Sequence, residues 1–319
     1  MNHSWPIPRW IFLFAACLAV LTWFLIIVGG IVHGTGSSLA CPDWPTCYGT
    51  FFPEMKGGVF FEHSHRIVAA TVGFLSILLC IFLLWKGEGV LKWMGIVAVL
   101  LVIFQGILGG ITVIYRLPTA ISTAHLATSM LFLALMVWIA LRSRFPLKSN
   151  LDGNATPWPG LKRVLVPTAL LVYFQIVLGG FVRHTGAGLA CLDIPLCQGS
   201  PWPAGAPPML KFHMLHRIVA LAVACAVFFS SFRIHHSVPK SNPLRALAIS
   251  APLLVVLQVT LGLLSVHQLL ALAPVTAHLA VGALLWVNMI LWILIARTPQ
   301  TEMAPAARSL GESFQYSRI

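Results

Sequence analysis

Long apolar stretches, each about 20 residues in length, recur along this 319-residue chain and constrain its fold more than any other feature. A helix of that length crosses the hydrocarbon core of a bilayer. The predicted spans are 11–32, 66–85, 93–114, 121–142, 164–183, 217–236, 247–267 and 275–297. Because 58% of the residues are hydrophobic and only 9% are charged, we predict an all-α integral membrane protein with eight transmembrane helices.

Basic residues predict the topology. The N-terminus, the second, fourth and sixth connections and the C-terminal tail hold 14 of the 20 lysines and arginines, and the other four connections hold 6. By the positive-inside rule, both termini are expected in the cytoplasm. The net charge of +12 is thereby attributed to topology and to anionic membrane lipid, without a nucleic-acid partner.

The segment before the first span favours a bacterial inner-membrane protein. It holds one Arg and two Pro, and has neither a transit peptide's composition nor a small-residue cleavage site. We therefore expect a retained first helix.

The chain contains an internal repeat. Val28–Val32 matches Leu178–Val182 at an offset of 150, and Thr123–Ala127 matches Thr276–Ala280 at 153. We expect two repeated four-helix bundles related by a pseudo-two-fold axis along the membrane normal, because each half has an even number of spans. The predicted division is 1–145 for the N-terminal half, 146–163 for a cytoplasmic linker, 164–297 for the C-terminal half and 298–319 for a cytoplasmic tail.

Four histidines occupy matching places in the repeat. His65 and His216 lie 151 residues apart, and His125 and His278 lie 153 apart, each expected within the first turn or so of a span that begins on the outer side. A single membrane histidine often only hydrogen-bonds a neighbouring helix. Two imidazoles facing each other in a four-helix bundle, however, are what axial ligation of a heme iron requires. We predict two bis-histidine heme pockets, His65 with His125 and His216 with His278.

Glycines and arginines accompany these histidines. The glycines are Gly29-Gly30, Gly109-Gly110, Gly179-Gly180 and the single Gly262. They could admit a flat macrocycle to the backbone or serve helix packing alone. Arg66 and Arg217 directly follow a ligand candidate, where each could contact a heme propionate or anchor to lipid headgroups.

Four of the seven cysteines form two matching pairs in the loops predicted to lie outside. We expect Cys41 to pair with Cys47 and Cys191 with Cys197, because disulfides persist in that compartment. Each pair could be a loop staple or could exchange electrons with a thiol system or with heme. The spacing disfavours a zinc site.

One acidic residue breaks the symmetry of the repeat. Glu62 precedes His65 by three residues, and the second copy has His213 in its place. Glu62 could be a helix-start carboxylate favoured by the helix dipole. The alternative is that the first half performs chemistry, with Glu62 handling a proton or water, and the second half holds an electron-transfer heme.

The motifs carrying a family resemblance are Glu62-x-x-His65-Arg66, Thr123-Ala124-His125, His216-Arg217, Thr276-Ala277-His278 and the paired loop cysteines. As a set they are specific, and from the first span to the eighth the sequence resembles the heme A synthase family. The resemblance implies oxidation of a methyl group of heme O to a formyl group by successive hydroxylations. It further implies that water is the oxygen source and that the heme A formed serves terminal oxidases.

The resemblance also implies roles for individual residues. His65 and His125 would flank the substrate heme O, Glu62 would be the catalytic acid, and His216 with His278 would ligate a heme b cofactor. Contacts with heme O synthase and with a thiol-disulfide system, and the oligomeric state, are left open.

Two rival functions remain at this stage. A membrane cytochrome b that passes electrons needs the histidine pairs but has no use for the asymmetry at Glu62. A heme carrier or assembly factor would hold heme without converting it.

Overall fold

A computed structural model describes residues 7–145, 158 and 160–298, and in this part of the chain the regular structure is helical. The helices are α1 (Arg9–Gly34), α2 (Gly57–Lys86), α3 (Val90–Ile114), α4 (Thr119–Arg144), α5 (Lys162–His184), η1 (Ala187–Leu189), α6 (Pro208–Ser237), α7 (Pro243–His267) and α8 (Leu272–Arg297). The eight α-helices are each long and apolar enough to cross a membrane. The predicted fold class is therefore confirmed. Most of the predicted linker and, apart from Thr298, the predicted tail lie outside the described residues.

Two helix starts were predicted too late. α2 begins at Gly57 and α6 at Pro208, so His65 and His216 lie about two turns inside their helices and not in the first turn. Hydropathy marks only the stretch that matches the bilayer core. The backbone hydrogen bonds of a helix continue through the polar residues before it, and Pro208 supplies a favourable first position.

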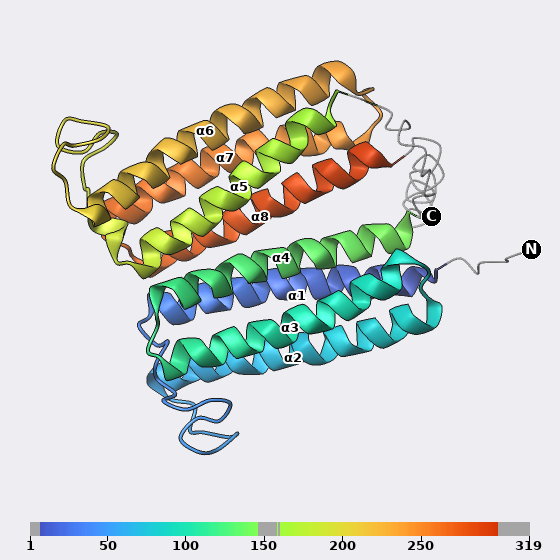
Figure 1. Cartoon of the computed structure of the whole chain (residues 1–319), viewed down its shortest axis with the longest axis horizontal. Coiled ribbons are helices and arrows are strands. Elements are labelled where there is room, and N and C mark those ends of the chain that lie inside the picture. Colours follow the sequence, from blue (N-terminus) through green and yellow to red (C-terminus); the bar gives the residue numbers. More distant parts are fainter. Residues whose placement is uncertain (1–6, 146–157, 159, 299–319) are drawn as a thin grey trace, which may run out of the picture.

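The helices form two groups of four. Figure 1 shows α1 to α4 on one side and α5 to α8 on the other, with α1 and α4 facing α5 and α8 across the middle. The loops that follow α1 and α5 lie at one end of the molecule, opposite the beginning of α1 and the end of α8. The division into repeated halves and the two-fold axis along the membrane normal both stay predictions.

Contacts between the two groups occur in matching pairs. The indole N–H of Trp23 donates to the carbonyl of Ala280 at 3.0 Å, and the hydroxyl of Tyr173 donates to the carbonyl of Ala127 at 3.1 Å. Trp23 matches Tyr173 at the offset of 150, and Ala127 matches Ala280 at 153. The interface between the groups therefore repeats the internal similarity of the sequence.

The second glycine of two pairs also packs at this interface. A Cβ at Gly30 would lie 2.7 Å from Cδ2 of Leu279, and a Cβ at Gly180 would lie 2.5 Å from Cδ2 of Leu126. Close helix approach over small residues is a common way to pack membrane helices. Helix packing therefore accounts for Gly30 and Gly180.

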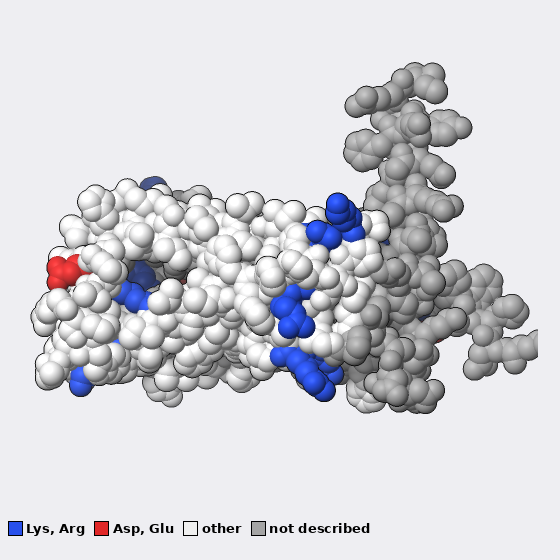
Figure 2. Space-filling view, turned by 90° about the horizontal axis from the view of Figure 1, so that it is seen from above, with Lys and Arg blue, Asp and Glu red and all other residues white. Residues whose placement is uncertain are grey.

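The outer surface suits lipid contact. Large apolar side chains such as Phe74, Leu100 and Leu253 are exposed along the helices. On the face seen in Figure 2, lysines and arginines gather toward both ends of the long axis, and the middle is free of charge. That distribution is expected where an apolar belt faces hydrocarbon and the ends face water.

Candidate functional site

Each of the four predicted ligand histidines lies against a glycine of the preceding helix. The distances from a Cβ built on the glycine to Cε1 of the ring are 3.1 Å for Gly29 and His65, 3.5 Å for Gly109 and His125, 2.9 Å for Gly179 and His216, and 3.2 Å for Gly262 and His278. Three of the four are tighter than ordinary van der Waals contact. These glycines therefore make room for a histidine ring, a role that the sequence had not distinguished from packing or from contact with a macrocycle.

The first histidine pair has ring nitrogens without protein partners. Nδ1 of His65 and Nδ1 of His125 are buried and lack a hydrogen bond to any described residue. The backbone of His125 is fixed by Gln105, whose amide donates to the His125 carbonyl at 3.1 Å and to the Thr128 hydroxyl at 2.7 Å. Buried polar atoms are normally paired. Because Nδ1 of each ring is enclosed by protein, Nε2 is the nitrogen left to face a ligand such as a heme iron.

The second pair is held more closely by protein. Nδ1 of His278 lies 3.0 Å from the backbone carbonyl of Gln258, and Nδ1 of His216 lies 3.0 Å from the side-chain amide nitrogen of Gln175. A proton on Nδ1 of His278, donated to that carbonyl, leaves Nε2 with a free lone pair, which is the usual preparation of a metal-ligating histidine. His278 is therefore prepared for heme ligation, whereas Nδ1 of His216 accepts from the Gln175 amide and the ring is not prepared in the same way. Ligation in both halves stays a prediction.

Glu62 is buried in α2, with only 4% of its surface exposed. Oε1 accepts from Nη2 of Arg66 at 2.6 Å, forming an ion pair within the helix. Oε2 accepts from the backbone N–H of Cys41 at 2.7 Å. Because Glu62 lies beyond the first turn of α2, the helix-dipole explanation does not account for its position. Each carboxylate oxygen therefore accepts a hydrogen bond, one from Arg66 and one from Cys41 in the loop that carries the first disulfide.

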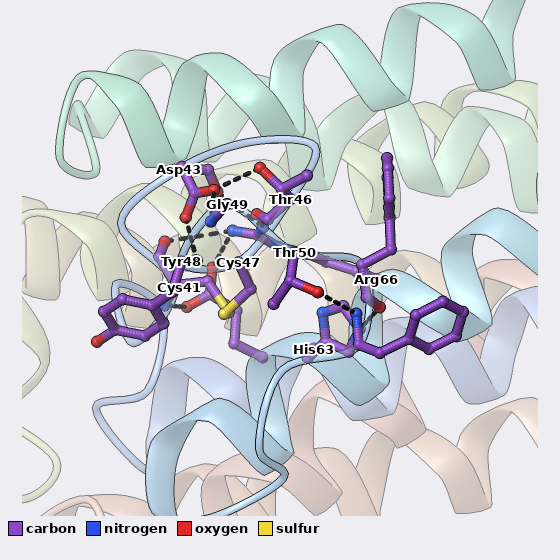
Figure 3. Close-up of a disulfide and its surroundings, with 12 residues drawn as sticks. Cys41, Asp43, Thr46, Cys47, Tyr48, Gly49, Thr50, His63 and Arg66 are labelled. Atoms are coloured by element: carbon purple, nitrogen blue, oxygen red, sulfur yellow. Dashed lines mark hydrogen bonds and ion pairs between the residues drawn. A yellow bond between two sulfur atoms is a disulfide. The ribbon is translucent and has the colours of Figure 1, made fainter.

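Arg66 also binds this loop. Its guanidinium donates to the carbonyls of Asp43 at 2.8 Å and of Cys41 at 3.3 Å, and also to the carbonyl of Thr46. Figure 3 shows Arg66 reaching from α2 to the turn that carries Cys41 and Cys47. The sequence had suggested a propionate contact or a lipid contact for Arg66, and it did not predict these bonds to loop carbonyls. The propionate contact stays a prediction.

Arg217 makes matching bonds in the second half. It donates to the carbonyls of Cys191 at 2.7 Å and of Asp193 at 2.6 Å. Cys191 and Asp193 correspond to Cys41 and Asp43 at the offset of 150. Each arginine therefore connects a histidine-bearing helix to a cysteine loop by hydrogen bonds. A propionate contact of Arg217 also stays a prediction.

The two predicted disulfides are present. Cys41 pairs with Cys47 and Cys191 with Cys197. We call residues 35–56 the first cysteine loop and 185–207 the second cysteine loop. Both loops connect helices at the same end of the molecule.

Aspartates support the turns within these loops. The Asp43 carboxylate accepts from the backbone N–H groups of Tyr48 at 2.6 Å and Gly49 at 2.9 Å, and from the Thr46 hydroxyl. The Thr46 hydrogen bond, followed by that of Gly49, lowers the pKa of Asp43. In the second cysteine loop, Asp193 accepts from the N–H of Gln198 at 3.1 Å.

The surroundings of the two disulfides differ. His63 is buried, and a ring nitrogen lies within 4.8 Å of both Cys41 Sγ and Cys47 Sγ. The matching residue of the second half is Met214, which packs with the Cys191–Cys197 disulfide in an apolar cluster. The sequence comparison that isolates Glu62 also pairs His63 with Met214 at the offset of 151. That signal was available, but nothing in the sequence placed His63 beside the sulfur atoms.

Comparison with known proteins extends over nearly the whole chain. Residues 9–290 match the COX15-CtaA family model, described as cytochrome oxidase assembly protein. The chain is 31% identical to "Heme A synthase" of Bacillus pumilus, over 88% of this chain and 94% of the relative. It is 28% identical to "Heme A synthase" of Shewanella oneidensis, over 85% and 92%, and 26% identical to "Heme A synthase" of Geobacillus kaustophilus, over 94% and 96%.

Proposed function

Because the chain belongs to the COX15-CtaA family of cytochrome oxidase assembly proteins, we propose that it is a heme A synthase, which oxidises a methyl substituent of heme O to the formyl group of heme A. Relatives similar over most of their length bear that name. The structural observation that carries the proposal is an asymmetry. Two matched histidine pairs lie in the two halves, and among the described residues only the first has a buried carboxylate, Glu62, one turn from a ligand candidate.

The two halves have different tasks in this proposal. The N-terminal half, 1–145, binds heme O between His65 and His125. The C-terminal half, 164–297, binds heme b between His216 and His278. Heme b supplies an electron acceptor close to the reaction. The glycine contacts support the proposal, because a side chain at Gly29, Gly179 or Gly262 would press on the facing imidazole.

Glu62 handles protons. Conversion of a methyl to a formyl group takes one oxygen atom from water and releases four electrons and four protons, by successive hydroxylations. A carboxylate held next to the substrate accepts protons from water and from the hydroxylated carbon substituent. Arg66 and the N–H of Cys41 fix the direction of its oxygens. A fixed base of this kind lowers the barrier because it needs little reorientation during the reaction.

The proposed setting is a bacterial inner membrane. Both termini face the cytoplasm, and the cysteine loops and histidine pairs lie toward the outer side, as the basic residues predict. Heme O synthase would supply the substrate, and a thiol-disulfide system would act on the loop cysteines.

Pigment analysis tests the proposal. The chain is produced in membranes supplied with heme O, and extracted hemes are separated by chromatography. We expect hydroxylated and formyl hemes from the unsubstituted protein. Glu62→Gln should retain bound heme but yield no formyl heme, and Glu54→Gln, which alters an exposed glutamate paired with Lys56, should leave the product unchanged.

Two results would contradict the proposal. Undiminished formyl heme from Glu62→Gln would remove the catalytic role of this carboxylate. If the unsubstituted protein contained only protoheme and unaltered heme O, an electron-transfer cytochrome or a heme carrier would be the better description.

A further inference from the structure

The first cysteine loop is tied to the catalytic carboxylate by more than one bond. The N–H of Cys41 donates to Glu62, and the carbonyls of Cys41, Asp43 and Thr46 accept from Arg66, which also pairs with Glu62. All of these loop groups lie in the segment closed by the Cys41–Cys47 disulfide. Glu62 and Arg66 therefore depend on that closed ring for several of their partners.

The loop also packs beside the first histidine pair. A Cβ at Gly110 of α3 would lie 2.8 Å from the ring of Trp44 in the first cysteine loop, and the neighbouring Gly109 faces His125. In the second half, the position of Gly110 is taken by Leu263, whose side chain is exposed. The first cysteine loop is thus in contact with α2, which carries His65, and with α3, whose Gly109 faces His125.

The second half has the disulfide without this connection. Arg217 binds the carbonyls of Cys191 and Asp193, but His213 stands where Glu62 does in the first half, and an imidazole cannot form an ion pair with an arginine. Leu210 and Met214 surround the Cys191–Cys197 disulfide with apolar atoms. In the described part of the second half, the carboxylate near this pair is that of Asp193, an exposed loop residue, and a buried helix carboxylate like Glu62 is not found.

We propose that the Cys41–Cys47 disulfide and Arg66 are positioning elements for Glu62, so that reduction of this disulfide by a dithiol displaces the carboxylate and stops the oxidation. The inference rests on the proposed function, because it assigns a consequence to moving Glu62. A thiolate of the reductant attacks one sulfur to give a mixed disulfide, and its second thiol displaces the cysteine. Two electrons and two protons pass to the protein, leaving Cys41 and Cys47 as thiols and the reductant as a disulfide.

Opening the ring moves Glu62 for an entropic reason. Closure keeps the carbonyls of residues 41, 43 and 46 converged on one guanidinium. Without the cross-link the segment gains many conformations, which weakens a contact made by several of its residues at once. The guanidinium of Arg66 then loses the carbonyls that hold it, and the Glu62 carboxylate loses its hydrogen bond from the Cys41 N–H.

Carbodiimide labelling of Glu62 in the full-length protein tests the inference without measuring heme conversion. Dicyclohexylcarbodiimide reacts with carboxyl groups, and mass spectrometry gives the labelled fraction of the peptide containing Glu62. The oxidised protein should label slowly. Dithiothreitol should increase the rate about tenfold, the factor expected from losing one hydrogen bond to a charged group.

Three variants sharpen the comparison. Cys41→Ser with Cys47→Ser should label quickly with or without reductant. Cys191→Ser with Cys197→Ser should respond to dithiothreitol like the unsubstituted protein. Arg66→Lys keeps the charge but lacks the fork that reaches both Glu62 and the loop carbonyls, so it should label quickly even with the disulfide closed.

The outcomes separate the two proposals. Unchanged Glu62 labelling, in protein whose Cys41 and Cys47 are shown by alkylation to be reduced, would overturn the positioning role. Faster labelling together with formyl-heme formation that continues at full rate would also overturn it. A labelling switch in protein that makes no formyl heme under any condition would leave the positioning role intact and overturn the proposed function.

Discussion

At the scale of single residues, the glycines facing the histidines are the most sensitive positions. Gly179→Ala places a Cβ 2.9 Å from Cε1 of His216, which forces the ring or the helix to move. We expect the overpacking to lower the free energy of unfolding by about 1–3 kcal/mol and to reduce the heme bound in the second half. Denaturant titration and a reduced-minus-oxidised spectrum measure the two effects.

Gly106→Ala is the matched control. Gly106 lies in the middle of α3 with no neighbouring atom within 4 Å of its Cβ position. An added methyl there should leave the heme spectrum unchanged and raise stability by up to about 1 kcal/mol, because alanine has the higher helix propensity. If Gly179→Ala behaved like this control, the close fit of the His216 ring against Gly179 would contribute neither to the free energy of unfolding nor to heme binding.

Sequence reasoning could single out the residues marked by the repeat, whose ligand and catalytic roles stay predictions, but it could not find contacts that depend on loop folding. The four ligand candidates and Glu62 follow from comparing the two copies, since the sequence alone shows which residues are repeated and which are not. The bonds from Arg66 to loop carbonyls are different. A backbone carbonyl has no sequence signature, so the partners of Arg66 emerge only once the first cysteine loop is folded against α2.

At the scale of elements, the first cysteine loop is expected to respond to acid through Asp43. Its pKa is lowered from 3.8 by the Thr46 and Gly49 hydrogen bonds, so the folded state favours the carboxylate. The resulting stabilisation is complete above the unfolded pKa and is lost as pH falls through the lower folded pKa. We expect the protection of the Tyr48 and Gly49 amides against hydrogen exchange to persist at pH 5 and to decline below about pH 4.

Asp43→Asn supplies the comparison for that pH dependence. Asparagine does not titrate, and its amide provides one acceptor oxygen instead of two. The variant should show weaker protection of these two amides at pH 5 and no further loss that tracks carboxylate protonation. Acid-induced loss of the same size in the variant and the unsubstituted chain would show that Asp43 is not responsible.

Helix boundaries show a second limit of the sequence. The eight spans could be located because hydropathy reports immersion in hydrocarbon, and all eight are present. The starts of α2 and α6 were missed because Glu62, His63 and His213 are polar residues at buried helical positions. Polar residues that a protein buries for function interrupt the signal by which the helix would be recognised.

At the scale of the whole molecule, the two halves meet through contacts that repeat. Gly30 packs on Leu279, and Gly180 packs on Leu126. Both glycines are the second of a pair, and both leucines directly follow a ligand candidate. The interface therefore joins the backbone of one half to the histidine-bearing helix of the other, so that a distortion at the interface reaches the histidine pairs.

Double-mutant cycles test whether the two repeated glycine–leucine contacts have similar coupling energies as well as similar geometry. Gly30→Ala and Gly180→Ala each overpack a leucine, and we expect each to lower the free energy of unfolding by about 1–3 kcal/mol. Truncation of the facing leucine makes room for the new methyl. The pairs Gly30→Ala with Leu279→Ala and Gly180→Ala with Leu126→Ala should therefore be less destabilised than the sums of their single variants predict.

The crossed pair is the control. Gly30→Ala with Leu126→Ala joins residues from different contacts, and their effects should add to within about 0.5 kcal/mol. A pseudo-two-fold relation between the halves requires similar coupling energies for the two direct pairs, because the same atoms meet in each. Strong coupling in one direct pair and additivity in the other, measured by denaturant titration, would show that the sequence repeat is not matched by equivalent packing of the two halves.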